Sequence, residues 1–210
     1  MPPSLFVLGD SISIQYGPYL EQMLQGICGY ARKEEVAEGT QTPDYPAGAN
    51  GGDSSMALAY LRHRFEEEGF APNNMLLLNC GLHDVKTNPK TGRTQVSLAD
   101  YARNLRQILA LMQQRPIKLI WVRTTAVDDA RHNSRVSEFH RFNRDVLAFN
   151  GAADEIFASA GTPIIDLNRF TANLFGEVYC DHVHFTEPVR AQQAAFIAGY
   201  TAATLQSSRT

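Results

Sequence analysis

Short apolar runs alternate along this chain with longer segments in which apolar residues recur at the spacing of a helix. The runs at 4–8, 75–79 and 117–122 are typical of strands buried on both faces, and 162–166 is a weaker fourth. A further strand is expected within 33–40, where the pattern is poor. The sequence thus predicts a set of short, buried strands.

Helical periodicity fills the stretches between these runs. Helices are expected near 16–27, 54–68, 97–114, 135–160 and 187–205. Strand followed by helix, repeated along a chain, is the pattern of right-handed βαβ units and therefore of parallel strands. We expect a three-layer α/β/α fold, in which helices cover both faces of a mainly parallel sheet of about five strands.

The composition is that of an ordinary globular protein. The chain has 210 residues, of which 44% are hydrophobic and 20% are charged, which separates it from disordered and fibrous proteins. No repeat, low-complexity tract or linker-like segment divides it. Residues 1–210 are therefore expected to form a single domain.

Charge and hydropathy argue against two classes of partner. The net charge is -3 and the chain has no run of Lys or Arg, so a nucleic-acid partner is not expected. No apolar stretch reaches the roughly 20 residues of a membrane helix, and the run at 5–8 is too short for a signal peptide. We therefore expect a cytoplasmic protein without membrane insertion, although a trimmed leader would leave the same sequence.

The cysteines point to no structural role. Cys28, Cys80 and Cys180 are widely spaced and contain no CxxC pair. This usage argues against a disulfide framework and against a zinc knuckle. They are expected to be free, buried thiols.

Polar motifs follow several of the predicted strands, at the edge where open α/β sheets bind ligands. Ser11 comes soon after the first strand, and Asp181 and His184 are three residues apart near the end of the chain. A serine hydroxyl becomes nucleophilic when an imidazole takes its proton and a third group holds that imidazole in one tautomer. The three residues can form such a set, whereas Ser11 by itself is more typical of a helix cap.

Two further strand ends carry groups that can donate hydrogen bonds to an oxyanion. The segment 50–55 contains Gly51 and Gly52 ahead of a helix, so its backbone N–H groups can approach a ligand closely. His83 and Asp84 follow the next strand and place an imidazole beside a carboxylate. Donors of this kind stabilise the charge that develops on a carbonyl oxygen during acyl transfer.

Together these motifs resemble the sequence blocks of the SGNH hydrolases, also called the GDSL esterase/lipase family, from Leu5 to the C-terminal helix. The matching segments are Gly9-Asp10-Ser11-Ile12-Ser13 for block I, Gly51-Gly52-Asp53-Ser54-Ser55 for block II, Gly81-Leu82-His83-Asp84 for block III and Asp181-His182-Val183-His184 for block V. A single Gly-Asp-Ser is a weak match, but all four blocks in this order are specific.

The resemblance implies a flavodoxin-like sheet and a serine esterase without a cofactor or metal. It implies Ser11 as the nucleophile, His184 as the base and Asp181 as the group that orients the base. The oxyanion hole would consist of the Ser11 amide, a glycine amide of block II and a side chain of block III. Gly52 is favoured over Gly51 for the glycine, because Gly-Asp-Ser-Ser is similar to the family's Gly-Asp-Thr-Ser.

Block III departs from the family pattern Gly-x-Asn-Asp, because His83 stands at the asparagine position. A neutral imidazole still donates one hydrogen bond if a neighbour fixes its tautomer. We expect His83 to be the third donor of the oxyanion hole, with Asp84 or a backbone carbonyl fixing the tautomer. Asp10 is expected to hold the turn around Ser11 together.

The remaining histidines are expected outside the reaction. His182 is assigned to the rim of the site or to a structural role, and His63, His132 and His140 to solvated surface. A metal site built from the histidines and carboxylates of blocks III and V is the alternative, but their spacing fits no common zinc signature and leaves the serine motif without a role.

Two polar loops, 85–93 and 127–133, lie at the expected catalytic edge and are candidates for substrate recognition. Their cations, Lys86, Arg93 and Arg131, suit a sugar or other polar ester better than a long lipid chain.

The leading hypothesis is a carboxylester hydrolase that acts through an acyl-enzyme on Ser11, with a carbohydrate ester or another small ester as its substrate. Thioesterase, lysophospholipase and O-acetyltransferase activities would use the same residues. Two hypotheses from other classes are a non-catalytic binding module with a decayed oxyanion hole, and a flavodoxin-like binder of phosphate or a cofactor.

Overall fold

The computed structural model describes residues 3–33, 48–67 and 74–207. Within this part of the chain, five parallel strands form one sheet in the order β2-β1-β3-β4-β5. The strands are Ser4–Leu8 (β1), Gly29–Arg32 (β2), Asn74–Leu78 (β3), Lys118–Val122 (β4) and Ile164–Ile165 (β5). This is the flavodoxin-like strand order, and it confirms the predicted parallel α/β sheet.

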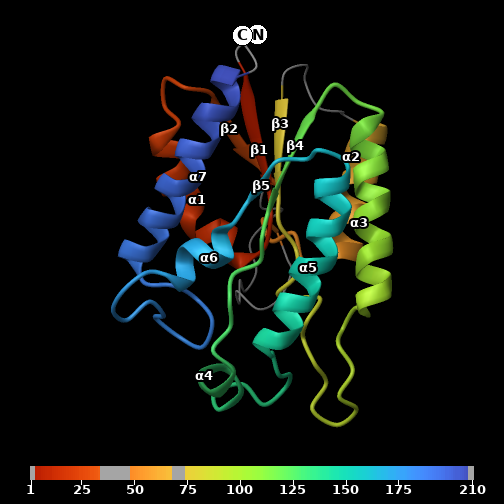
Figure 1. Ribbon diagram of the computed structural model, residues 1–210, viewed down its shortest axis with the longest axis vertical. Helices are drawn as coiled ribbons and strands as arrows, with labels where there is room; N and C mark the ends of the chain where they lie inside the picture. Colours follow the sequence, from red (N-terminus) through yellow and green to blue (C-terminus); the bar gives the residue numbers. More distant parts are fainter. Residues whose placement is uncertain (1–2, 34–47, 68–73, 208–210) are drawn as a thin grey trace.

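Helices cover both faces of the sheet (Figure 1). The helices are α1 (Ser11–Met23), α2 (Ser54–Glu67), α3 (Leu98–Gln113), α4 (Asp129–Asn133), α5 (Asn143–Ser159), α6 (Leu167–Ala172) and α7 (Glu187–Ser207). One layer contains α1 and α7, which pack against each other, and the other contains α2, α3 and α5, with α3 between its two neighbours. The three predicted layers are therefore present.

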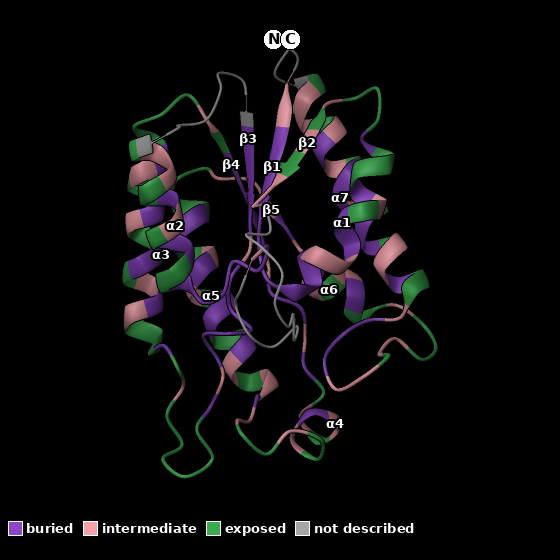
Figure 2. Ribbon diagram, turned by 180° about the vertical axis from the view of Figure 1, so that it is seen from behind, coloured by how far each residue is buried: buried purple, intermediate pink, exposed green. Residues whose placement is uncertain are grey.

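The central strands are apolar along most of their length because both of their faces are covered. Residues 5–8 of β1, 75–78 of β3 and 119–122 of β4 are all buried, and Figure 2 shows these strands largely in purple between the helices. On the α5 side, Trp121 stacks on Phe157 with ring centroids 4.8 Å apart. Removal of this apolar surface from water is the main favourable term in the stability of the sheet.

The edge strands differ from the sequence prediction. β2 lies ahead of the expected range 33–40, of which 34–40 fall outside the described residues. Its side chains alternate between exposed and intermediate burial, because an edge strand is only partly covered and needs no continuous apolar run. β5 is likewise shorter than the predicted 162–166.

Two helices begin at other residues than predicted. α1 begins at Ser11 rather than near residue 16, because Asp10 caps it: the Asp10 Oδ1 accepts a hydrogen bond from the Ile12 N–H at 3.0 Å. α5 begins at Asn143, and residues 135–142 are irregular chain instead of the first part of the predicted 135–160 helix. The early start of α1 places Ser11 close to the carboxyl end of β1.

No helix in the described part of the chain is long and apolar enough to cross a membrane. The three cysteines are free thiols, as predicted. The expectation that all are buried is wrong, because Cys180 is exposed and Cys28 is partly exposed, whereas Cys80 is buried.

Candidate active site

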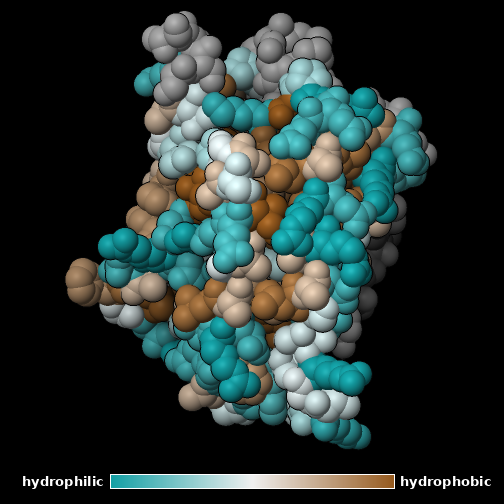
Figure 3. All heavy atoms as spheres, turned by 45° about the vertical axis from the view of Figure 1, so that its right-hand side comes forward, coloured by the Kyte–Doolittle hydropathy of each residue, from teal (hydrophilic) through white to brown (hydrophobic). Residues whose placement is uncertain are grey.

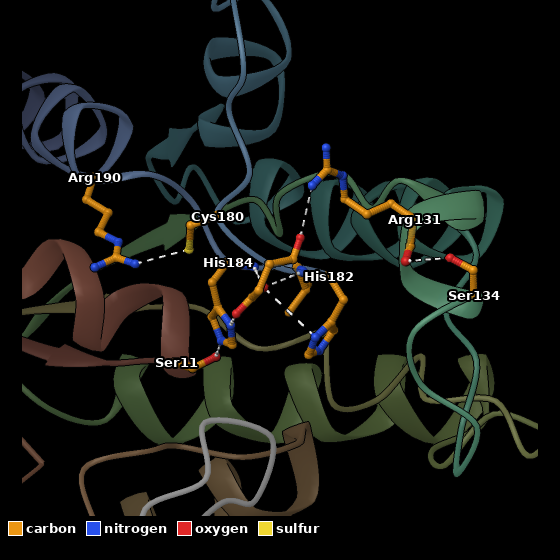
Figure 4. Close-up of polar contacts among 9 residues, drawn as sticks. Ser11, Arg131, Ser134, Cys180, His182, His184 and Arg190 are labelled. Atoms are coloured by element: carbon orange, nitrogen blue, oxygen red, sulfur yellow. Dashed lines mark hydrogen bonds and ion pairs between the residues drawn. The ribbon is translucent and has the colours of Figure 1, made fainter.

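The serine, histidine and aspartate of blocks I and V form a continuous hydrogen-bonded chain. The Ser11 Oγ lies 2.9 Å from the Nε2 of His184, although the two residues are 173 positions apart. The His184 Nδ1 lies 2.7 Å from the Asp181 Oδ2. Figure 4 shows the His184 ring between Ser11 and the loop that carries His182. The structure therefore brings together the three residues that the sequence singled out.

Backbone hydrogen bonds shape the loop that holds Asp181. Its Oδ1 accepts hydrogen bonds from the N–H groups of Val183 and His184, both at 2.7 Å. Burial by itself would raise the pKa of Asp181, but these amides and the His184 ring outweigh burial and lower that pKa to about 2. The carboxylate is therefore ionised at neutral pH and accepts the Nδ1 hydrogen of His184, which leaves Nε2 to accept the Ser11 hydroxyl hydrogen.

Asp10 fixes the turn on which Ser11 stands. Asp10, and not Ser11, is the cap of α1, so the Ser11 hydroxyl remains available to His184. The Asp10 carbonyl also accepts a hydrogen bond from the Ser13 hydroxyl at 2.7 Å. Burial raises the pKa of Asp10, while the Ile12 amide and the charge of Arg141 lower it. The structural role expected for Asp10 agrees with these contacts.

The two glycines of block II use their amides differently. The Gly51 N–H donates to the Gly9 carbonyl at 2.8 Å, which joins block II to block I through the main chain. A Cβ at Gly51 would lie 3.1 Å from that carbonyl oxygen, so the close approach favours glycine. The Gly52 N–H donates to the Asn50 Oδ1 at 2.9 Å. Of the two amides, that of Gly52 is therefore held by a side chain rather than by the main chain.

Block III places His83 in a buried position with 1% of its surface exposed. Its Nε2 lies 3.5 Å from the Asn50 Nδ2, and its Nδ1 is buried without a hydrogen-bond partner among the described residues. Burial, helped by the charges of Lys86 and Arg141, lowers the pKa of His83 to about 2. The imidazole is therefore neutral at physiological pH and carries one N–H.

Asp84 makes no hydrogen bond to the His83 ring in the described part of the chain, although the sequence indicated Asp84 or a backbone carbonyl as the group that fixes the tautomer. Its two carboxylate oxygens accept the Ser54 N–H at 3.0 and 3.1 Å. Burial raises the pKa of Asp84 to about 7, although the hydrogen bonds from Ser54 oppose this. Asp84 thus ties the end of β3 to the first residue of α2, and the fixing of the imidazole tautomer falls to another residue.

Arg141 is a residue of the site that the sequence analysis missed. It is buried, with 2% of its surface exposed, and its Nε donates to the Leu82 carbonyl at 2.8 Å. Its guanidinium lies over the Phe139 ring, 4.9 Å from the centroid. An arginine in a polar loop is normally expected to be solvated, and only the contacts between segments reveal that it supports block III.

His182 lies next to the serine–histidine–aspartate chain. Its ring centroid is 5.9 Å from that of His184, and its Nδ1 is 3.9 Å from the Asp181 Oδ1. His132 is fully buried and its ring lies 4.9 Å from that of His182, so its expected place on solvated surface is wrong. Within the described residues, no three His, Cys, Asp or Glu side chains are grouped so that they could hold a metal ion.

A polar pocket of about 540 Å³ lies on the loop that follows block III. Its lining residues are Lys86, Asn88, Thr91, Arg93, Thr94, Gln95, Glu138 and Phe139. Thr87 and Thr94 pair as an antiparallel bridge and form a short two-stranded ribbon. Side chains alternate between the two faces of such a ribbon, so the residues next to the pair, 86 and 88 on one strand and 93 and 95 on the other, share a face. Hydrophilic residues gather over the lower end of the molecule in Figure 3, the end at which Figure 1 places this loop.

One residue of the pocket lining, Gln95, is hydrogen-bonded to block II, and of the three cations expected in recognition the lining contains two, Lys86 and Arg93. The Gln95 Nε2 donates to the Asp53 Oδ2 at 2.7 Å, which anchors the ribbon beside Gly52. Arg131 is not part of the pocket lining. Its guanidinium instead donates to the Glu177 Oε1 at 2.7 Å and to the Asp181 carbonyl at 3.3 Å, as Figure 4 shows in part.

Solved structures with this fold are numerous. A lipase/acylhydrolase from Enterococcus faecalis is 16% identical with a TM-score of 0.69, and the match covers 96% of each chain. An M. smegmatis aryl esterase is 12% identical with a TM-score of 0.63, covering 96% of this chain and 99% of the other. The carbohydrate acetylesterase Est24 from Sinorhizobium meliloti is 13% identical with a TM-score of 0.60, covering the same shares. At these identities the likeness concerns the fold.

A search among curated proteins found no match. The model of the GDSL-like Lipase/Acylhydrolase family, by contrast, matches residues 7–189. This range includes all four blocks and the three hydrogen-bonded residues Ser11, His184 and Asp181. The protein therefore belongs to the GDSL-like lipase/acylhydrolase family.

Proposed function

We propose that this protein is a serine esterase that hydrolyses carboxylic esters through an acyl-enzyme on Ser11. The observation that carries the proposal is the chain from the Ser11 hydroxyl through His184 to an ionised Asp181. It combines a nucleophile, a base and an orienting group in the order that acyl transfer requires.

In the first half of the reaction, the Ser11 Oγ attacks the ester carbonyl carbon while the His184 Nε2 takes the hydroxyl hydrogen. The tetrahedral intermediate then expels the alcohol, which leaves with the proton from His184, and the acyl group stays on Ser11. In the second half, water attacks the acyl carbon and gives a proton to His184. That proton returns to the Ser11 Oγ as the carboxylic acid departs, so the enzyme is regenerated.

The oxyanion of each intermediate would be bound by the amides of Ser11 and Gly52 and by the His83 ring. The Ser11 amide belongs to the first residue of α1, where N–H groups lack partners within the helix and favour negative charge. The Gly52 N–H donates to the Asn50 Oδ1, and a substrate oxygen would share or replace that bond. Each such donor contributes about 3–4 kcal/mol to catalysis.

The preferred substrates are small polar esters, with acetylated carbohydrates first among them. The pocket on the loop after block III is lined by hydroxyl, amide and charged side chains, with Phe139 as its aromatic residue. The Asn88 Oδ1 accepts the N–H groups of Lys90 and Thr91 at 2.9 and 3.1 Å, which leaves its NH2 group for a ligand hydroxyl. Because seven of its eight lining residues are polar or charged, this pocket favours a polar substrate over a long acyl chain.

Two experiments test the proposal. Ser11→Ala should abolish hydrolysis of aryl acetates and labelling by a fluorophosphonate while its circular dichroism spectrum stays native, and His184→Ala should be comparably severe. Asp181→Asn should cost no more than either. A Ser11→Ala variant with near wild-type turnover would exclude the mechanism.

The substrate is tested by comparing aryl esters from acetate to long chains with acetylated sugars. We expect kcat/KM to fall as the acyl chain lengthens and acetylated sugars to be turned over. A preference for long-chain esters, for thioesters or for transfer to a second alcohol would assign the same residues to a different acyl-transfer activity.

A further inference from the structure

The orientation of the Asn50 side chain follows from its hydrogen bond to the main chain. Asn50 is 2% exposed, and its Oδ1 accepts the Gly52 N–H at 2.9 Å. A backbone N–H can only donate, so this end of the amide must be the oxygen. The opposite end, the NH2 group, is therefore the end that lies 3.5 Å from the His83 Nε2.

This orientation determines the proton on His83. An NH2 group can only donate, so the Nε2 that faces it must be the ring nitrogen without hydrogen. Because His83 is neutral, its single hydrogen is then on Nδ1. That nitrogen is buried and has no hydrogen-bond partner among the described residues. Buried donors are nearly always paired in folded proteins, so an unpaired one points to an acceptor that binds there.

A ligand oxygen can be that acceptor. Nδ1 is bonded to Cγ, as the side-chain nitrogen of an asparagine is, so both are reached through the same number of bonds from the main chain. An Nδ1–H at position 83 can therefore replace the amide N–H of the family pattern as a donor to the oxyanion. With the hydrogen on Nε2 instead, Nδ1 would present a lone pair to the oxyanion and repel it.

We propose that Asn50 is a positioning residue that fixes His83 in its Nδ1–H tautomer and so makes the imidazole a donor in the oxyanion hole. The proposal rests on the esterase function proposed above. It also accounts for the contact of one buried amide with both groups assigned to the hole: its oxygen holds the Gly52 N–H, and its nitrogen holds the far side of the His83 ring.

Asn50→Asp tests the tautomer directly, because it keeps the shape and the acceptor for Gly52 but places an oxygen opposite the His83 Nε2. In long-range ¹H–¹⁵N spectra of the ¹⁵N-histidine-labelled protein, we expect wild-type His83 to show its hydrogen on Nδ1 and the variant to show it on Nε2. The His83 signals are assigned by their loss in His83→Asn. Asn173→Asp, at an exposed residue, makes the same change of charge and should leave the spectrum unchanged. Retention of the Nδ1 hydrogen in Asn50→Asp would overturn the proposal.

Kinetic measurements distinguish the effect of Asn50 on the His83 tautomer from its effect through the hydrogen bond to Gly52. Asn50→Asp should lower kcat by about a hundredfold or more, with a smaller change in KM, because a donor becomes an acceptor where negative charge develops. In a His83→Asn background the same substitution should cost less than tenfold, because an amide has no tautomer to lose, whereas any effect through Gly52 remains. An equal loss in both backgrounds would overturn the proposal. The spectra require no turnover, so a Ser11 that neither hydrolyses esters nor reacts with a fluorophosphonate, in a protein with the predicted tautomer, would refute the esterase function and leave only the tautomer assignment standing.

Discussion

Gly81→Ala should disrupt both the fold and the site, because the end of β3 has no space for a side chain. Gly81 has a φ of +154°, and a Cβ built on it would lie 2.2 Å from the Oγ1 of Thr124. The Thr124 hydroxyl donates to the Cys80 carbonyl at 3.0 Å, so it cannot move without breaking a bond between the ends of β3 and β4. The contact must therefore be relieved by the main chain.

Gly81→Ala should lower the free energy of unfolding through overpacking, about 1–3 kcal/mol, and through backbone strain, about 1–3 kcal/mol, which together amount to about 2–6 kcal/mol. This is a large share of the stability of a typical domain, about 5–15 kcal/mol. His83 and Asp84 follow on the same turn, and a displacement of about 1 Å at a reacting group lowers the rate by about a hundredfold. We expect kcat for an aryl acetate to fall at least that far.

Urea unfolding measures the stability, and two other glycines serve as controls. Gly92 has a φ of +68° with open space around it, so Gly92→Ala reports strain alone, about 1–2 kcal/mol. Gly151 lies within α5 with open space around it, so Gly151→Ala should stabilise the protein by about 0.5–1 kcal/mol. The cost of Gly81→Ala should shrink by at least about 1 kcal/mol in a Thr124→Ala background, since that substitution removes the Oγ1 that makes the shortest contact. A Gly81→Ala variant within about 0.5 kcal/mol of wild type would refute the reasoning.

Three further predictions concern titration and the loops. The pH profile of kcat/KM should contain no inflection from His83, because burial lowers the pKa of that ring to about 2; an inflection that His83→Asn removes would contradict this. The raised pKa of Asp84, about 7 in the folded protein against 3.8, means that its contribution to stability is fully present below 3.8 and is lost as pH rises through 7. Urea titrations should therefore show wild type losing stability relative to Asp84→Asn between pH 4 and 8, and a constant difference would refute the assignment. Arg131→Gln should lower kcat severalfold for every ester alike, because Arg131 donates to the Asp181 carbonyl rather than to substrate. A variant that changed only the preference among esters would show instead that Arg131 contributes to substrate recognition.

The sequence predicts the parts of the fold that are buried on both faces and misplaces those that are not. The central strands β1, β3 and β4 lie within about a residue of their predicted ranges, because a short, continuous apolar run is typical of a strand in the middle of a parallel sheet. β2 is partly exposed, and its sequence Gly29–Arg32 carries no such run. The start of α1 depends on one side-chain cap, the Asp10 carboxylate, which periodicity does not detect.

For the candidate site, the sequence identifies which residues meet but not how they bond. Ser11, Asp181 and His184 could be named in advance, since parallel strands bring their carboxyl ends to one edge and a spacing of three closes a turn. The partners of Asp84 and His83 could not be named, because Ser54 and Asn50 come from another segment. Which hydrogen bond a buried group makes is decided by contacts across segments, and no local pattern encodes it.

The buried ionisable groups at the edge of the sheet show why the site needs this many contacts between segments. Burial raises the pKa values of Asp10 and Asp84 and lowers that of His83, so desolvation opposes charge on all three side chains. The charge of Arg141 lowers the pKa of Asp10 as well as that of His83, and so favours the ionised form of the carboxylate and the neutral form of the imidazole. A neutral His83 can have its single hydrogen placed by a neighbouring amide, whereas a protonated ring would donate from both nitrogens and make Asn50 irrelevant. Burial, helped by the charges of Lys86 and Arg141, therefore keeps the His83 ring neutral, and the buried Asn50 can then choose its tautomer.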